Sequence, residues 1–357
     1  MLFLVRRYFY TVARKARKNK VFAFSMVGLL VALSTVGNAW TFYYFDGAQN
    51  PNLSVWDSVW MSIISITTIG YGDYSPRTPG ARIGTMIFTV IIGLTAFTTF
   101  LGMVVDWIIE LNHKELRGML PVYSKKHVLI VNFPSGSRVR SIIEELQSDE
   151  HHKHKDIILV ADNIDAPPFD YKNFSFVKGS PLEADTFERA NVHEAETAIV
   201  LGTDYNDPNS DSMTTSVVAL LEHMHPGLRT IAECIDVKHE MLFSTVKCDA
   251  IVFPLRLANN LLVQETQDTG VAQFVDVMTS NLRGETIYAT EVPAGQAGDA
   301  PYHGLAVKML ERDMNLVCVI RDRQYKTRFR EMSLREGDSL VYICSERKDW
   351  SFFKALI

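Results

Sequence analysis

The feature that most constrains this chain is a charge-free apolar run from Val21 to Phe45. At about 1.5 Å of rise per residue, a helix of this length crosses a hydrocarbon layer of about 30 Å. Trp40, Tyr43 and Tyr44 gather at one end, as in an interfacial aromatic belt, and a basic cluster lies at the other. Because positive charge stays on the cytoplasmic side, we expect the N-terminus inside the cell. The alternative is a signal peptide, but the run is too long and lacks a small-x-small cleavage site.

A second apolar run, from Ile83 to Ile109, is expected to return the chain to the cytoplasm. The intervening segment Ser54 to Thr67 is too short to cross a bilayer. We interpret it as a re-entrant half helix with Ser54 as its N-cap. Because irregular backbone survives at membrane depth only inside protein or beside water, the residues that follow this half helix should line water.

Those residues read TTIGYGD, from Thr67 to Asp73. Glycine accepts positive φ, so alternate backbone carbonyls can turn toward one axis. A threonine hydroxyl adds another ligand layer, and the tyrosine ring can pack outward against the half helix. Four such loops would replace the hydration shell of a cation, as in a potassium filter.

This stretch resembles the filter signature of potassium channels, with Ile69 in place of the commoner valine. The order of span, pore helix, filter and span is also that of the family. The resemblance implies a selectivity filter made of Thr68, Ile69, Gly70, Tyr71, Gly72 and Asp73, with ion sites from the first four carbonyls and the Thr68 hydroxyl. It also implies that Trp60 supports the filter through a hydrogen bond to Asp73.

Gly93 lies midway along the second span, where a glycine costs about 1 kcal/mol relative to alanine. The resemblance makes it a gating hinge, and tight helix packing is the alternative. Asp106 and Glu110 are four residues apart and share a helix face at the inner end of this span. In a tetramer they would form two acidic rings that concentrate cations. A solvated helix end is the alternative.

The rest of the chain has the composition of a soluble protein. The net charge of −5 gives no indication of nucleic-acid binding. The four cysteines form no C-x-x-C pair, which argues against zinc and favours reduced thiols in a cytosolic domain. Short apolar segments alternate with helical patterns, which predicts a parallel, doubly wound sheet. The expected strands are 127–133, 156–163, 174–181, 196–204, 229–236 and 250–254.

The segment VKGSPLEADTFERANVHEAETAIVLGTD resembles the regulator-of-potassium-conductance (RCK) domain, as in archaeal calcium-gated potassium channels and Trk-type gating subunits. The tail LREGDSLVYI resembles the last strand of that family's small C-terminal lobe. The fold class implied is an α-helical pore domain followed by a Rossmann-like α/β RCK domain with a small α+β lobe. We therefore expect a basic cytoplasmic segment (1–20), a pore domain (21–112), a linker (113–124), an RCK N-lobe (125–254), a helical crossover for dimerisation (255–285) and a C-terminal lobe (286–357).

Two ligand classes compete for the RCK domain. A dinucleotide site needs G-x-G-x-x-G after the first strand, but this chain has NFPSGSR there. Asp162, at the end of the second strand, is nevertheless placed for a ribose hydroxyl of an adenine nucleotide or NAD. By resemblance to the calcium-gated relatives, Asp211 and Glu233 would bind Ca²⁺ or another divalent cation, while Ile235 replaces a third acid. Asp204 and Asp207 are further candidate oxygen ligands.

The resulting hypothesis is a homotetrameric, potassium-selective channel in the plasma (inner) membrane, with multiple spans and both termini cytoplasmic. The resemblance implies that RCK domains dimerise into an octameric ring, with four further domains from a soluble copy. Our hypothesis is that translation of this copy starts at Met119. No catalytic constellation is visible, so we expect no enzyme. The alternative is a membrane-tethered nucleotide-binding regulatory protein or enzyme with a non-conducting pore.

Overall fold

The computed structural model describes residues 20–207, 209–296, 300–322 and 324–357. The basic N-terminal cluster, apart from Lys20, lies outside these residues. The chain divides into two compact units, Met1–His113 and Lys114–Ile357, which are described separately below.

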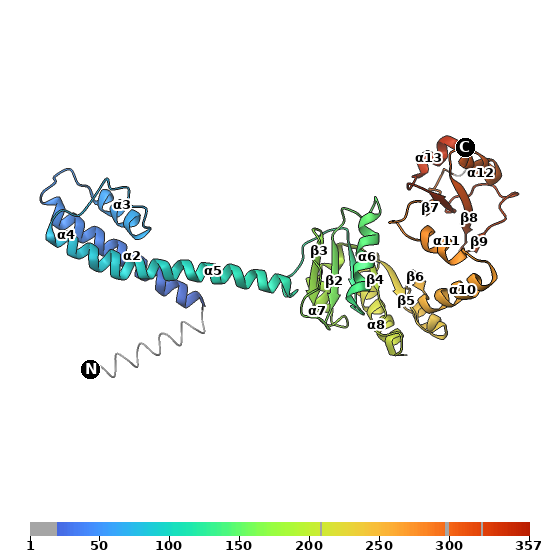
Figure 1. The fold of residues 1–357 in the computed structure, drawn as a ribbon, viewed down its shortest axis with the longest axis horizontal. Helices are drawn as coiled ribbons and strands as arrows, with labels where there is room; N and C mark the ends of the chain where they lie inside the picture. Colours follow the sequence, from blue (N-terminus) through green and yellow to red (C-terminus); the bar gives the residue numbers. More distant parts are fainter. Residues whose placement is uncertain (1–19, 208, 297–299, 323) are drawn as a thin grey trace. The chain divides into compact units, whose positions relative to one another are not determined.

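The first unit is helical (Figure 1). It contains α2 (Lys20–Gly47), α3 (Val55–Ile66) and a second long helix built from α4 (Pro79–Gly84), the π-helical segment η1 (Thr85–Gly93) and α5 (Leu94–Leu116). Two helices, Lys20–Gly47 and Pro79–Leu116, are long and apolar enough to cross a membrane. Only 17% of the apolar window of each is buried, whereas the core helix of a soluble protein is mostly buried.

The half helix α3 begins where the sequence predicts. Ser54 Oγ accepts the backbone N–H of Asp57 at 3.1 Å, and Asp57 Oδ2 accepts the N–H of Ser54 at 2.9 Å. This reciprocal capping box satisfies two of the N–H groups that a helix start leaves without a partner. Ser54 is therefore confirmed as the N-cap of α3.

The second unit opens with a six-stranded parallel sheet in the order β3-β2-β1-β4-β5-β6. Its strands are β1 (His127–Val131), β2 (Ile157–Ala161), β3 (Phe174–Lys178), β4 (Ala195–Val200), β5 (Arg229–Glu233) and β6 (Ala250–Val252). The chief helices between them are α6 (Gly136–Ser148), α7 (Ala184–Arg189), α8 (Asn209–Met224) and α9 (Glu240–Thr245). The predicted Rossmann-like sheet is confirmed, and its order reverses between β1 and β4.

The sheet is covered on both faces. Every residue of β1 and β2 is buried, as expected of central parallel strands. One core cluster contains Leu129, Val131 and Ile158, and a second contains the intervening residues Ile130 and Leu159. The two alternating sets face opposite layers, which explains why these strands read as continuous apolar runs rather than alternating ones.

The remaining chain forms two helices and a small lobe. The helices α10 (Pro254–Gln267) and α11 (Val271–Met278) contain no buried residue. A four-stranded antiparallel sheet follows in the order β7-β10-β8-β9. The lobe comprises β7 (Thr286–Glu291), α12 (Tyr302–Leu310), β8 (Asn315–Arg321), β9 (Gln324–Lys326), β10 (Ser339–Cys344) and α13 (Trp350–Leu356). This confirms the predicted small α+β lobe. All four cysteines of the chain are free.

Candidate functional site

The loop after α3 leaves directly from the carboxyl end of that helix. Ile64 O accepts the N–H groups of Ile69 and Gly70, at 3.0 and 3.1 Å. φ is +61° at Thr68, +56° at Gly70 and +79° at Gly72, so every second residue lies in the left-handed region. Alternation of this kind gathers N–H groups on one side of the backbone and leaves the carbonyls on the other. The loop therefore has the backbone pattern that a carbonyl-lined ion path requires.

Trp60 ties this loop to the half helix. Its Nε1 donates to Asp73 Oδ2 at 2.8 Å, so the hydrogen bond predicted from the sequence is present. The Trp60 ring also stacks on Tyr71, with centroids 5.9 Å apart and planes 9° apart. The tyrosine ring thus packs against the half helix, as expected, and the loop is attached to α3 at two points, Ile64 near its carboxyl end and Trp60 in its middle.

Gly93 lies where the second long helix closely approaches two neighbours. A Cβ built on Gly93 would lie 2.4 Å from Ser34 Oγ and 2.9 Å from the side chain of Ile66. Both distances are shorter than real carbon contacts, so the structure contains the tight packing that was the alternative explanation for this glycine. Gly93 is also the last residue of the π-helical segment, so a hinge role stays a prediction.

The two acidic residues of α5 differ in their surroundings. Glu110 forms an ion pair with Lys20 at the start of α2. Asp106 is exposed. The Lys20–Glu110 pair could not be predicted from local patterns, because its partners lie far apart along the chain. The acidic rings stay a prediction, since they require four copies.

An ion pair that the sequence analysis missed joins α6 to the end of β5. Arg138, in the first turn of α6, pairs with Glu233 at the end of β5. The backbone N–H of Gly202, just after β4, donates to Glu233 Oε2 at 2.9 Å. Burial raises the pKa of Glu233, while the Gly202 N–H and Arg138 oppose that shift. Asp162, the predicted ribose ligand, is exposed after β2.

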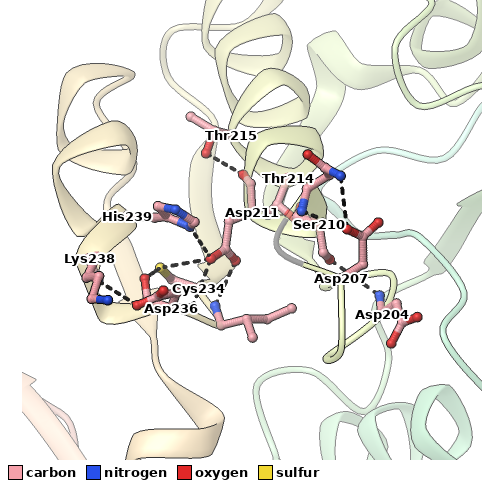
Figure 2. Close-up of polar contacts among 12 residues, drawn as sticks. Asp204, Asp207, Ser210, Asp211, Thr214, Thr215, Cys234, Asp236, Lys238 and His239 are labelled. Atoms are coloured by element: carbon pink, nitrogen blue, oxygen red, sulfur yellow. Dashed lines mark hydrogen bonds and ion pairs between the residues drawn. The ribbon is translucent and has the colours of Figure 1, made fainter.

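Asp211 forms the centre of a second polar cluster, drawn in Figure 2. Only 1% of this residue is exposed. Its Oδ1 accepts the N–H of Ile235 at 2.7 Å, and its Oδ2 accepts the N–H of Asp236 at 2.9 Å. His239 Nδ1 lies 2.8 Å from the same Oδ2. Asp211 therefore anchors the loop after β5 to the start of α8.

The two predicted divalent-cation ligands, Asp211 and Glu233, accept hydrogen bonds from other groups of the protein. Asp211 binds backbone N–H groups, and Glu233 binds Arg138 and Gly202. Across the ranges that the structure describes, no three His, Cys, Asp or Glu side chains gather as metal ligands. Burial raises the pKa of the neighbouring Cys234 thiol to about 12, and the nearby carboxylate of Asp211 adds to that shift. Asp204 and Asp207 each close a local turn, accepting the N–H groups of Asn206 and Asn209.

Comparison with known families matches a part of each unit. Residues 26–110 match the family model described as an ion channel. Residues 123–232 match the calcium-activated potassium channel slowpoke-like RCK domain.

Individual relatives are more distant. The calcium-gated potassium channel TvoK of Thermoplasma volcanium is 23% identical over 308 residues, which are 82% of each chain. The Bacillus subtilis protein YugO is 25% identical over 183 residues, and the chain covers 53% of its length, about half. A solved structure titled "GsuK channel bound to NAD" aligns with a TM-score of 0.44 and 18% identity over 90% of this chain and 57% of that one. That likeness is too loose to carry an argument.

Together, the fold and the two family matches define a protein with an ion-channel domain of two apolar helices followed by an RCK domain. This combination matches the two-span prokaryotic potassium channels with an RCK domain. The resemblance expected from the sequence is thereby confirmed.

Proposed function

We propose that four copies of this chain form a potassium-selective channel that is opened or closed by a ligand of the RCK domain. The observation that carries this proposal is the loop Thr67 to Asp73, which combines alternating positive φ with attachment to a half helix between two spans. A dehydrated K⁺ would exchange its water for the carbonyls of Thr68, Ile69, Gly70 and Tyr71.

Potassium flux from liposomes that contain the purified chain tests the proposal. Gly70 has φ +56° and open space around it, so Gly70→Ala strains the loop without a steric clash. The flux is expected in the wild type and lost in Gly70→Ala. Gly28→Ala is the matched control, because a Cβ at Gly28 also meets nothing but Gly28 lies within α2. Wild-type protein that releases no K⁺, either alone or with Ca²⁺, Na⁺, ADP, ATP or NAD⁺, would refute the proposal and favour a regulatory protein with a non-conducting pore.

The gating ligand is proposed to be a divalent cation at Asp211 and Glu233 or a nucleotide beside Asp162. A cation would have to displace the N–H groups and Arg138 that now bind the two carboxylates. Binding would then release the loop after β5, and a ligand acts through such a difference in affinity between two conformations. Titrating the flux separately with Ca²⁺, Na⁺, ADP, ATP and NAD⁺ identifies the ligand class. A calcium response that survives Asp211→Ala excludes the divalent assignment.

The helices α10 and α11 are proposed to pair RCK domains into a ring. Their apolar side chains are uncovered in the single chain, including Leu262 at 68% exposure and Phe274 at 56%. Pairing with a second copy would remove this apolar surface from water. Native mass determination of the wild type and of Leu262→Lys tests this, since the charge should dissociate the pairs.

A soluble copy of the RCK domain is proposed to start at Met119. It should appear as a short product that Met119→Leu abolishes.

The chain is proposed to lie in the plasma (inner) membrane with both termini in the cytoplasm. The support is the aromatic cluster at one end of α2 and the basic segment at the other. A reporter fused to the C-terminus should be active only if that end is cytoplasmic. Activity of an exported reporter would contradict this orientation.

A further inference from the structure

A network of polar side chains is buried in the first unit, at the depth of the apolar spans. Asn38 of α2 donates through Nδ2 to Ser62 Oγ of α3 at 2.9 Å. Its Oδ1 accepts from Thr85 Oγ1, at the start of η1, at 3.0 Å. Asn38 and Ser62 are both 0% exposed. One amide therefore joins the first span, the half helix and the second span.

Such a network is costly unless every member has a partner. Hydrocarbon offers no hydrogen bonds, so an unpaired polar group there costs several kcal/mol. The amide of Asn38 satisfies both neighbours at once, because its nitrogen donates while its oxygen accepts. Movement of either neighbour must therefore carry Asn38 along or break a bond in a place without water.

The network continues from Ser62 toward the filter loop. Ser62 Oγ donates to Ser58 O at 2.7 Å, which fixes the hydroxyl on α3. Two residues beyond Ser62, the carbonyl of Ile64 accepts the N–H groups of Ile69 and Gly70. A displacement of α3 at Ser62 thus displaces the backbone from which the filter loop starts.

On the other side, the network ends on an irregular element. Thr85 is the first residue of the π-helical segment η1, whose last bond runs from Leu94 N–H to Thr89 O, five residues back. Ser34 Oγ of α2 donates to Phe88 O within this segment. Segments of π-helix are rare and are often found at functional sites, because the chain around them can change its winding. A change in winding here would move Thr85 and, through Asn38, the half helix.

We propose that Asn38 is a positioning residue for ion selection, which couples the π-helical segment of the second span to the half helix that carries the filter. The inference rests on the proposed potassium channel function. It predicts that conformational changes of the second span alter the filter geometry itself as well as the inner mouth of the pore. The second span also packs directly against Ile66 of α3 at Gly93, but the hydrogen-bonded path to Ser62 runs through the side chain of Asn38, so one substitution removes that path.

The test is the K⁺/Na⁺ permeability ratio, obtained from reversal potentials of the full-length channel in bilayers. Asn38→Ala should lower this ratio by about 3-fold to 20-fold, the range that single hydrogen bonds between membrane helices support. Thr85→Val, which is nearly isosteric, should also lower the K⁺/Na⁺ permeability ratio. The control is Thr35→Ala, because Thr35 Oγ1 bonds only to Val31 O of its own helix. Its ratio should equal that of the wild type.

Two further variants test the coupling itself. Ser62 and Thr85 each form a hydrogen bond with Asn38, so the effects of Ser62→Ala and Thr85→Val should be non-additive if Asn38 connects them. A ratio unchanged in Asn38→Ala, or effects of Ser62→Ala and Thr85→Val that simply add, would overturn the inference. If Asn38→Ala fails to assemble, the additivity of Ser62→Ala and Thr85→Val alone decides between these outcomes. A wild type without K⁺ selectivity would instead refute the proposed function, whatever the Asn38 variants do.

Discussion

Asp211 offers a sharp test of how the RCK domain is built. The carboxylate is buried and accepts the N–H groups of Ile235 and Asp236, and His239 Nδ1 lies against it. Asp211→Ala leaves all three groups without this partner. Breaking a buried charged contact by removing one partner costs about 3–5 kcal/mol.

This cost is large enough to measure as a shift in melting temperature. A unit of this size loses about 2–4 °C per kcal/mol, so the RCK transition should fall by about 6–20 °C. Calorimetry of the full chain in detergent, with a chelator present, separates this effect from cation binding. Asp207→Ala is the control, because Asp207 is exposed and its carboxylate, among the described residues, accepts hydrogen bonds from Asn209 alone, so the effect should be much smaller than that of Asp211→Ala.

The opposite pattern would refute the reasoning. In this pattern, Asp211→Ala and the wild type have the same melting temperature in chelator. Ca²⁺ raises the melting temperature of the wild type but not that of Asp211→Ala. Asp211 would then be a metal ligand rather than an anchor for the loop after β5. A ligand that binds the folded state alone raises the melting temperature by mass action. Melting both proteins with chelator and with Ca²⁺ therefore distinguishes a metal ligand from a loop anchor.

Three further predictions concern other sites. Trp60→Phe removes the 2.8 Å bond to Asp73, worth about 1 kcal/mol, and should lower K⁺/Na⁺ selectivity by about 5-fold in reversal-potential measurements. Gly93→Ala places a Cβ 2.4 Å from Ser34 Oγ, so overpacking should destabilise the first unit by about 1–3 kcal/mol in thermal melts. An unchanged melt would contradict this packing. Burial lowers the pKa of His127 below its usual 6.5, so the unfolded chain takes up the proton first and stability falls as pH drops below that value. The melting temperature of His127→Gln should lose this acid dependence. An equal slope of melting temperature against pH in both proteins would exclude this contribution of His127.

Local patterns in the sequence were sufficient to predict the architecture. Run length and charge predicted the two long helices, and Ser54 with Asp57 marked the start of α3. Alternating apolar segments predicted the parallel sheet, because buried strands and amphipathic helices each have a period that the chain displays. The Trp60–Asp73 bond was also predicted, but from the resemblance rather than from spacing.

Contacts between distant segments could not be predicted in this way. Arg138 and Glu233 are 95 residues apart, and their pairing depends on how β1 and β5 are ordered in the sheet. The π-helical segment has no local signature, since its apolar residues would suit an α-helix equally well. Asn38 looks like one polar residue in an apolar run until Ser62 and Thr85 are brought beside it. Topology, rather than composition, determines these sites.

The most direct test of the account is the reversal potential of the reconstituted wild-type channel with K⁺ on one side of the bilayer and Na⁺ on the other. The account predicts a large potential, of the sign that K⁺ permeation alone would give, because the loop from Thr68 to Tyr71 offers carbonyls in place of potassium's water. A potential near zero would mean that Na⁺ passes as readily, and the proposed role of this backbone would be contradicted.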